Sequence, residues 1–235
     1  MGQTSSRVPG RRPRRRPRQR PAWTAARWAE LGARLLLFAA LLWLAYAFGF
    51  ARGVQSVPAV EAHPSSAGDL GSRHAAGEIA AVIWQQPCRR RVREVILHHT
   101  WKPTAAQYNG ASTVRGILNY HVNSQGWGNM AYHYVIDPRG YVWLGRPLAE
   151  DGVHTAGHNR NTVAVCLLLN GDEEKVSAAQ QRAAGLVLRT LLERFGLRAE
   201  DNFDGEHGFH RDYADKTCPG ALISKEQVRG WLTAD

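Results

Sequence analysis

Residues 95–100 read VILHHT, an apolar run that ends in His98 and His99. A wholly apolar run is typical of a strand buried on both faces, and we predict a strand over residues 92–97. About 110 residues later, residues 208–220 read GFHRDYADKTCPG. A strand-end histidine together with His210 and Cys218 would suit a tetrahedral zinc whose fourth corner is open for water. The spacing alone fits a loop histidine and a buried free cysteine equally well.

The rest of the C-terminal region alternates between strand and helix patterns. The predicted elements are a helix over residues 112–124, a hairpin over residues 131–144, a strand over residues 162–169, a long helix over residues 177–196 and a final helix from residue 224. Residues 137–140 (DPRG) supply the turn of the hairpin. Ser177 with Gln180, and Ser224 with Gln227, have the spacing of capping boxes at the starts of the two helices. This order predicts an α/β domain with a mixed central sheet flanked by helices.

The N-terminal region has a different composition. Residues 1–34 carry ten arginines and one acid, Glu30, and so hold +9 of the net charge of +10. Residues 35–51 carry no charge, and as a helix they would be about 25 Å long, near the short end of what spans a bilayer. We predict an Arg/Pro-rich cytoplasmic tail, a single transmembrane helix over residues 35–51, a linker over residues 52–78 and a folded domain over residues 79–235. Arginines retained in the cytoplasm would place this domain outside the inner membrane, in the periplasm or cell envelope.

Other interpretations of the N-terminal region stay open. A cleaved signal peptide would have an unusually long basic region and apolar run. A buried core helix is disfavoured by the ten arginines beside it. An Arg-rich tail also binds nucleic acid, but its position next to an apolar span makes membrane topology the simpler explanation, and we expect no nucleic-acid partner. The sequence does not indicate an oligomeric state.

Several motifs occur in a recognisable order along the domain. They are ILHHT at residues 96–100, QGWGNMAYHYVID at 125–137, GYVWLGR at 140–146, HTAGHN at 154–159, NTVAVCL at 161–167 and the segment 210–219. Over about residues 90–225 the chain resembles the zinc-dependent N-acetylmuramoyl-L-alanine amidases, a family that includes amidase-type phage lysozymes and peptidoglycan recognition proteins. The resemblance implies that family's α/β fold, Zn²⁺ as cofactor and peptidoglycan or muropeptides as substrate. The bond cleaved would be the amide between N-acetylmuramic acid and L-alanine.

The resemblance also implies the identity of the metal ligands. The first ligand corresponds to His98, and the other two, eight residues apart, correspond to His210 and Cys218. His99 would be a neighbour only, because adjacent side chains of a strand point to opposite faces. Relatives that only bind peptidoglycan typically lack the cysteine. Its presence favours catalysis over the alternative, a non-catalytic peptidoglycan-binding module of the same fold.

Further roles follow from the matched positions. Lys216 is the candidate to stabilise the oxyanion as a point charge, and Tyr132 the candidate to orient the water or the intermediate. The plainer alternatives are a solvated loop lysine and a packed strand tyrosine. His154 is a candidate to line the substrate groove, while Asn161 and Arg146 are candidates for substrate binding or loop ordering.

The remaining histidines and cysteines have structural interpretations. His121 and His133 are expected to make structural hydrogen bonds. Cys166 lies within an apolar strand and is expected to be a buried thiol. A disulfide between Cys166 and Cys88 remains open at this stage, since the predicted location is outside the cytoplasm.

Overall fold

The computed structural model describes residues 71–234 of the chain. The predicted tail, the predicted transmembrane helix and most of the predicted linker lie outside the described residues. Within residues 71–234, no helix is both long enough and apolar enough to cross a bilayer.

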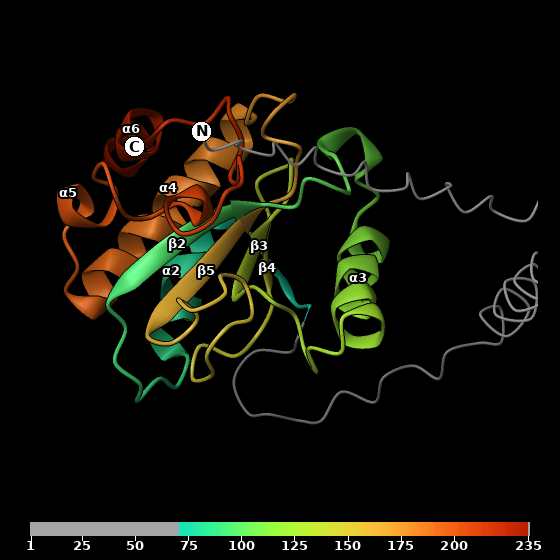
Figure 1. The fold of residues 1–235 in the computed structure, drawn as a ribbon, viewed down its shortest axis with the longest axis horizontal. Coiled ribbons are helices and arrows are strands. Elements are labelled where there is room, and N and C mark those ends of the chain that lie inside the picture. The colour runs from blue at the N-terminus through green and yellow to red at the C-terminus, as the bar shows by residue number, and fades with distance from the viewer. Residues whose placement is uncertain (1–70, 235) are drawn as a thin grey trace, which may run out of the picture. The chain divides into compact units, whose positions relative to one another are not determined.

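A five-stranded sheet forms the centre of the domain (Figure 1). Its strands are β1 (Arg73–His74), β2 (Glu94–His99), β3 (Tyr134–Ile136), β4 (Val142–Leu144) and β5 (Thr162–Leu167), in the spatial order β1-β4-β3-β5-β2. Strand β5 runs parallel to both β2 and β3, whereas β4 is antiparallel to β3 and β1. The predicted mixed sheet is therefore confirmed.

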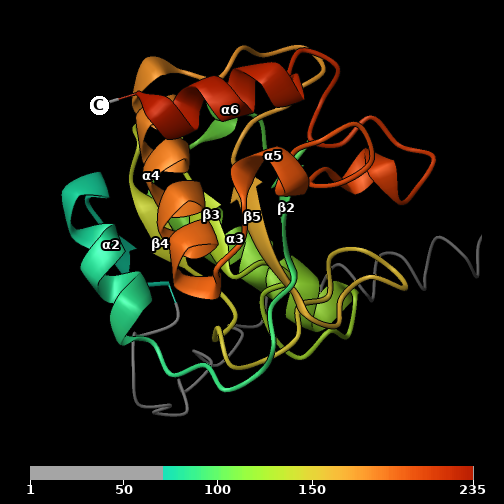
Figure 2. The ribbon, with the colours of Figure 1, turned by 90° about the vertical axis from the view of Figure 1, so that its left-hand side faces the viewer.

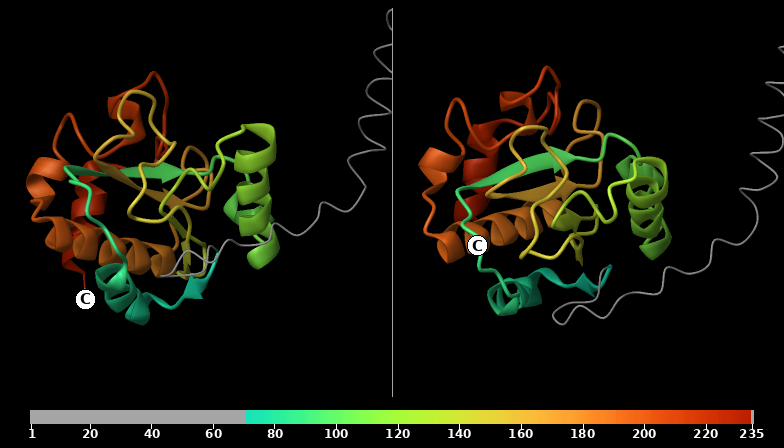
Figure 3. Two further views of the ribbon diagram at one scale, coloured as in Figure 1. Left: turned by 90° about the horizontal axis from the view of Figure 1, so that it is seen from below. Right: turned by 60° about the horizontal axis from the view of Figure 1, so that its bottom comes forward.

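Helices cover both faces of this sheet (Figures 2 and 3). Their bounds are α2 (Ala76–Gln85), α3 (Ala111–Asn119), α4 (Ala178–Phe195), α5 (Ala199–Asn202) and α6 (Lys225–Thr233). Helix α4 packs against α2 and α6 and lies along one face of the sheet, while α3 lies on the opposite side. Short turns complete the domain: η1 (Ala105–Gln107), the π-helical turn η2 (Tyr120–Ser124) and the 3₁₀ turn η3 (His210–Asp212).

The alternation of strand side chains divides the core between the two faces. Val95 and Leu97 of β2 join the large apolar cluster under α4, which also includes Val163 and Val165 of β5. A smaller cluster on the α3 side contains Cys166. His98 is paired in register with Cys166, so the β2 side chains between Val95 and His99 alternate between the α4 face and the α3 face.

The helix predicted over residues 112–124 is two elements. Helix α3 ends at Asn119 and the chain continues as the π-helical turn η2. The hydroxyl groups of Ser112 and Thr113, candidate caps by residue type, do not cap the helix: Thr113 Oγ1 accepts a hydrogen bond from Asn109 N, and Ser112 Oγ donates to Asn109 O. Both hydroxyls therefore order the turn before the helix. The spacing of apolar residues does not predict these side-chain contacts or the change to a π-helical turn.

The two predicted capping boxes differ in outcome. At α6, Gln227 N donates to Ser224 Oγ and Ser224 N donates to Gln227 Oε1, so the box is complete. At α4, Ser177 Oγ accepts from Gln180 N, but the Gln180 side chain donates instead to Ile136 O of β3. Gln180 is buried. Its amide therefore satisfies a carbonyl at the end of a central strand, which outweighs the local cap.

Two elements were missed because they leave little pattern. Strand β1 is only two residues long and pairs with β4, and α2 buries only Ile79 and Ile83 completely. Both elements begin within residues 52–78, the range expected to be linker. Two buried positions in a helix of ten residues are too few for a clear 3.6-residue period.

A close backbone contact joins the loop after β5 to the loop before α6. A Cβ placed on Gly171 would lie 2.1 Å from the carbonyl oxygen of Pro219, and Gly220 has φ of +123°. The backbone of Gly171 also accepts a hydrogen bond from Leu222 N at 3.0 Å. Glycine is required at Gly171 because any side chain would push the two loops apart.

We predict that Gly171→Ala lowers the free energy of unfolding by about 1–3 kcal/mol, the usual cost of forcing atoms into a packed site. The matched control is Gly116→Ala in α3, where an added Cβ meets no atom within 4 Å. That change should be neutral or stabilise the protein by up to about 1 kcal/mol, because alanine is the better helix former. Urea unfolding of the two variants measures the difference; equal stabilities would contradict the close-contact argument.

Candidate metal centre and groove

The two histidines at the end of β2 have different surroundings. His98 faces the α3 side of the sheet and is almost completely buried. His99 is also buried, and its Nδ1 accepts a hydrogen bond from Gly171 N at 3.0 Å. His99 is therefore occupied by the backbone of the loop after β5, as expected of a neighbour rather than a ligand.

The loop that carries His210 is attached directly to β2. Leu97 N donates to Gly208 O at 2.8 Å, and Leu97 and Phe209 form a parallel bridge. The Phe209 side chain is completely buried in the core below. These contacts start the turn η3 beside the end of β2, which places His210 next to His98.

Arg211 holds the two ends of this loop together. Its backbone N donates to Cys218 O at 2.8 Å. Its guanidinium donates from Nη1 to Gly220 O at 2.9 Å and from Nη2 to Ile223 O at 2.8 Å, and lies 4.6 Å from the ring centroid of Phe209. One side chain therefore ties the segment after His210 to the segment that carries Cys218. The sequence analysis did not single out Arg211, since nothing in its spacing distinguishes it from a solvated arginine.

An ion pair also stabilises the turn η3. The carboxylate of Asp212 accepts from Phe209 N at 2.8 Å and pairs with Lys225 Nζ at 2.9 Å. Both side chains are largely buried, with 10% of Asp212 and 14% of Lys225 exposed. The first residue of α6 is thereby connected to the turn that presents His210.

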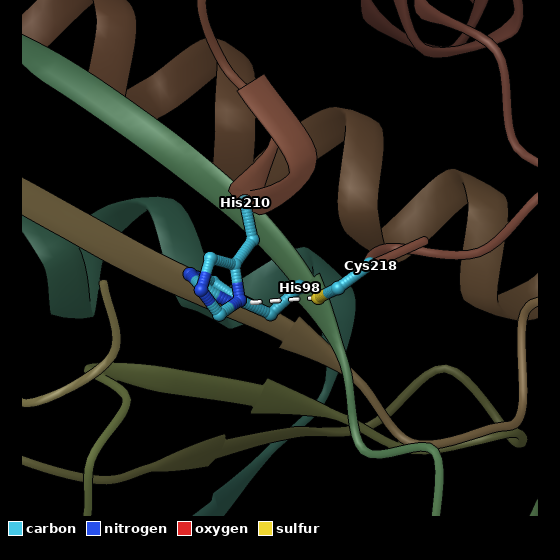
Figure 4. A group of neighbouring side chains, drawn as sticks. All are labelled: His98, His210 and Cys218. Carbon is cyan, nitrogen blue, oxygen red and sulfur yellow. Dashed lines mark hydrogen bonds between the residues drawn. The ribbon is translucent and has the colours of Figure 1, made fainter. Parts of the chain in front are cut away.

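The structure brings the three predicted ligands together (Figure 4). One ligand atom from each of His98, His210 and Cys218 lies within 4.8 Å of the other two. Nδ1 of His98 is 3.6 Å from Sγ of Cys218, and the ring centroids of His98 and His210 are 4.7 Å apart. In a tetrahedral zinc site, bonds of about 2.0–2.3 Å leave neighbouring ligand atoms about 3.3–3.8 Å apart. Two imidazoles and a sulfur at these separations fit Zn²⁺ with little adjustment.

The protonation of the cluster also suits a cation. Burial, followed by the charge of Lys216, lowers the pKa of His210 to about 4, and burial lowers the pKa of His98 well below its usual range. Both rings are therefore neutral near pH 7, as metal ligands must be. Burial raises the pKa of Cys218 to about 12. A buried thiolate needs a compensating cation, which a bound metal supplies.

Tyr132 and Lys216, the predicted catalytic residues, both border the cluster. The ring centroid of Tyr132 lies 5.3 Å from that of His98. Burial raises the pKa of Tyr132 well above its usual value, so the phenol stays protonated at neutral pH. Lys216 is exposed at the edge of the cluster, and its charge contributes to the lowered pKa of both histidine ligands.

A groove of about 1040 Å³ lies over these residues. His154, His210, Tyr132 and Lys216 are among its lining residues. The groove is also lined by aromatic side chains that the sequence analysis did not single out: Trp101, Tyr120, Trp127 and Tyr213. Their only signal in the sequence was their position near the motifs.

The predicted binding residues Arg146 and Asn161 do not border this groove. Arg146 donates from Nε to Met130 O at 2.8 Å and from Nη2 to Trp127 O at 3.0 Å, so it orders the loop before β3. Asn161 has φ of +63° and borders a different hollow of about 690 Å³. Its carbonyl accepts a hydrogen bond from Arg93 N at 2.8 Å. Of the two roles considered for these residues, the contacts fit loop ordering.

The remaining histidines and cysteines have structural contacts. Nδ1 of His121 accepts from Ala131 N, and Nδ1 of His133 accepts from Ala164 N, as expected for structural histidines. Cys166 is a buried thiol, as predicted. Cys88 is also unpaired, and its Sγ donates to a backbone carbonyl, so the disulfide left open by the sequence is absent.

Fold and site together define a mixed α/β protein with a His₂Cys cluster, able to hold a metal ion, in an open groove. The family model described as N-acetylmuramoyl-L-alanine amidase matches residues 89–221, more than half of the chain. The chain therefore belongs to this family, and the resemblance seen in the sequence is confirmed.

Individual relatives agree with this assignment. The chain is 31% identical over 139 residues to the N-acetylmuramoyl-L-alanine amidase of Homo sapiens, covering 57% of this chain but only 23% of the human protein. It is 32% identical over 138 residues to the endolysin of Enterobacteria phage T3, covering 55% of this chain and 82% of the endolysin. Among solved structures, the N-acetylmuramoyl-L-alanine amidase LysC from Clostridium intestinale URNW is similar with a TM-score of 0.52 and 24% identity, covering 62% of this chain and 88% of LysC. The last likeness bears on the fold alone.

We predict that Arg211→Met lowers the free energy of unfolding by roughly 2–4 kcal/mol, because hydrogen bonds from a charged donor contribute about 1.5–3 kcal/mol each and are not additive. Zinc affinity should also fall, because the contacts of the Arg211 side chain that join the segment of His210 to the segment of Cys218 are lost. The control is Arg189→Met, which removes a single hydrogen bond between α4 and Leu232 O of α6 and touches none of the three candidate ligands. Urea unfolding and zinc titration measure both quantities; unchanged zinc affinity in Arg211→Met would contradict this role.

Proposed function

We propose that the chain hydrolyses the amide bond between N-acetylmuramic acid and L-alanine in peptidoglycan or muropeptides, with Zn²⁺ held by His98, His210 and Cys218. The observation that carries the proposal is the convergence of these three ligand atoms within 4.8 Å beside an open groove. The family of the chain supports the choice of bond. The chain spans only 23% of the length of the human relative. The activity is therefore proposed from the residues of this site and is not taken over from the relatives.

Zinc bound in such a site acts as a Lewis acid and lowers the pKa of a water molecule towards about 7. The residues of the chain supply the rest. The neutral imidazoles and the thiolate would hold the ion, and the ammonium of Lys216, which lines the groove, would supply positive charge to the amide oxygen as it becomes negative. The protonated phenol of Tyr132, beside His98, is available as a hydrogen-bond donor to the reacting group.

The groove suits a substrate with both sugar and peptide parts. Trp101 and Tyr120 line it and are 55% and 54% exposed, so their rings are free to contact a ligand. Large exposed aromatic rings of this kind pack against the apolar faces of ligands while the groove supplies polar contacts. The volume of about 1040 Å³ accommodates a muropeptide fragment.

We also propose that the N-terminal segment anchors the chain in a membrane. A charge-free segment over residues 35–51 that follows ten arginines supports a single-pass anchor, with the domain on the outer side of the inner membrane. Full-length protein should then remain in the membrane fraction after a high-salt wash and be released by detergent. Release by salt alone would rule out the anchor.

We predict that Cys218→Ser reduces zinc affinity and abolishes release of peptide from purified peptidoglycan. Serine keeps the size of the side chain but does not provide a thiolate, the ligand that compensates the charge of the ion. Mass spectrometry of the products reports the bond directly, because cleavage leaves a new L-alanine N-terminus. Zinc bound by the wild type without any released peptide would favour a binding module of the same fold.

We predict that Lys216→Ala leaves zinc bound but lowers kcat by about 10²–10³-fold, the usual effect of removing one group that stabilises an oxyanion. The matched control is Lys175→Ala, which removes an exposed lysine that does not line the groove. Equal kcat values for the two variants would show that Lys216 is only a solvated loop lysine.

A further inference from the structure

The two ring nitrogens of His98 have different neighbours. Nδ1 lies 3.6 Å from Sγ of Cys218, on the side of the ligand cluster. Nε2 lies 3.1 Å from Nδ1 of His154, and the two rings meet edge to face. If Nδ1 is the nitrogen that binds the ion, Nε2 must carry the proton and needs an acceptor inside the protein.

The contacts of Thr162 determine whether His154 can be that acceptor. The Thr162 hydroxyl lies 2.7 Å from the carbonyl of His158 and 3.1 Å from that of Asn159. Since carbonyl oxygens only accept, the single hydroxyl hydrogen of Thr162 goes to one of them. Its lone pairs then face Nε2 of His154 at 3.2 Å. In the tautomer of His154 that donates from Nε2 to these lone pairs, Nδ1 is bare and able to accept from His98 Nε2 at 3.1 Å, with the Thr155 hydroxyl 3.0 Å away as the other group near Nδ1.

Backbone contacts hold His154 in this position without any ligand. The side chain of Asn159 accepts hydrogen bonds from the backbone N of His154 and of Thr155, each at 2.8 Å. His154 is only 8% exposed, so little of its surface is available to a substrate in the groove. Among residues 71–234, its ring nitrogens are hydrogen-bonded to His98, Thr155 and Thr162 and to no carboxylate.

We propose that His154 and Thr162 are positioning residues that hold His98 in the tautomer whose Nδ1 faces the metal. The relay runs from His98 Nε2–H to His154 Nδ1, and from His154 Nε2–H to the Thr162 hydroxyl. This inference rests on the metal site of the proposed function and gives His154, which lines the groove, a further role in orienting a ligand. Partners of this kind fix the ring and raise the basicity of the nitrogen that binds the metal.

The test at His154 compares two substitutions by zinc affinity, measured by competition with a chromophoric chelator at fixed pH. His154→Leu removes the acceptor and should weaken zinc binding by about 10–100-fold, the usual effect of losing such a partner. His154→Asn retains an amide oxygen near the position of Nδ1 and should keep affinity within a few-fold of the wild type. Urea unfolding of the metal-free proteins identifies any loss caused by misfolding.

The test at Thr162 uses a second matched pair. Thr162→Val keeps the shape but removes the hydroxyl, and should weaken zinc binding, whereas Thr162→Ser keeps the hydroxyl and should not. Because both residues act through His98, the double variant of His154→Leu and Thr162→Val should bind zinc no more weakly than His154→Leu alone. Nitrogen-15 NMR of the zinc-loaded wild type should show His98 protonated at Nε2.

The results separate this inference from the proposed function. Equal zinc affinity in His154→Leu and the wild type, with only a raised KM, would overturn the inference and restore His154 to substrate binding. A zinc affinity for His154→Asn as weak as that of His154→Leu would overturn it too. If the wild type and the variants bind zinc with the expected relative affinities but the wild type cleaves no peptidoglycan, the inference about His154 and Thr162 is confirmed and the proposed activity is wrong.

Discussion

The parallel pairing of β2 with β5 is the constraint on which the site depends. It places His98, on the edge strand β2, opposite Cys166 of β5 and directs the His98 ring towards the α3 side. Phe209 then bridges to Leu97 at the edge of β2, which brings the loop of residues 208–220 beside the same strand. A shift of one residue in the register would exchange His98 with His99 and leave the cluster without its first ligand.

The loop that supplies the other two ligands has little regular structure, and its shape is held by specific contacts. Arg211 satisfies carbonyl groups of Gly220 and Ile223, and Asp212 receives the backbone N of Phe209. The close approach of Gly171 to Pro219 fixes the far end. These contacts join the two ends of the loop to each other and to the loop after β5, and the bridge between Leu97 and Phe209 joins it to β2, so the candidate ligands are held in place without regular secondary structure.

The same arrangement connects structure to chemistry. A cluster of neutral imidazoles and a thiol in a buried site attracts a soft or borderline cation, while the groove on its open side admits a large ligand. His154 lines the groove, as predicted, and its Nδ1 also lies 3.1 Å from Nε2 of His98, the first candidate ligand. The groove itself is lined by aromatic rings from the loops around it.

The sequence predicted the mixed α/β class and most of the strands and helices, because hydrophobic periods are local signals, and the ordered motifs, through the family resemblance, indicated the three candidate ligands that the structure brings together. The tertiary structure decided which nitrogen of His98 faces the cluster, that Gln180 serves β3 and not its own helix, and that Asn161 lies at another hollow. It also revealed the contacts of Arg211 and Thr162, two residues that lie within motifs but that the sequence analysis did not single out. These outcomes depend on contacts between side chains and backbone atoms that only the packed chain brings within hydrogen-bonding distance, so no spacing along the sequence encodes them.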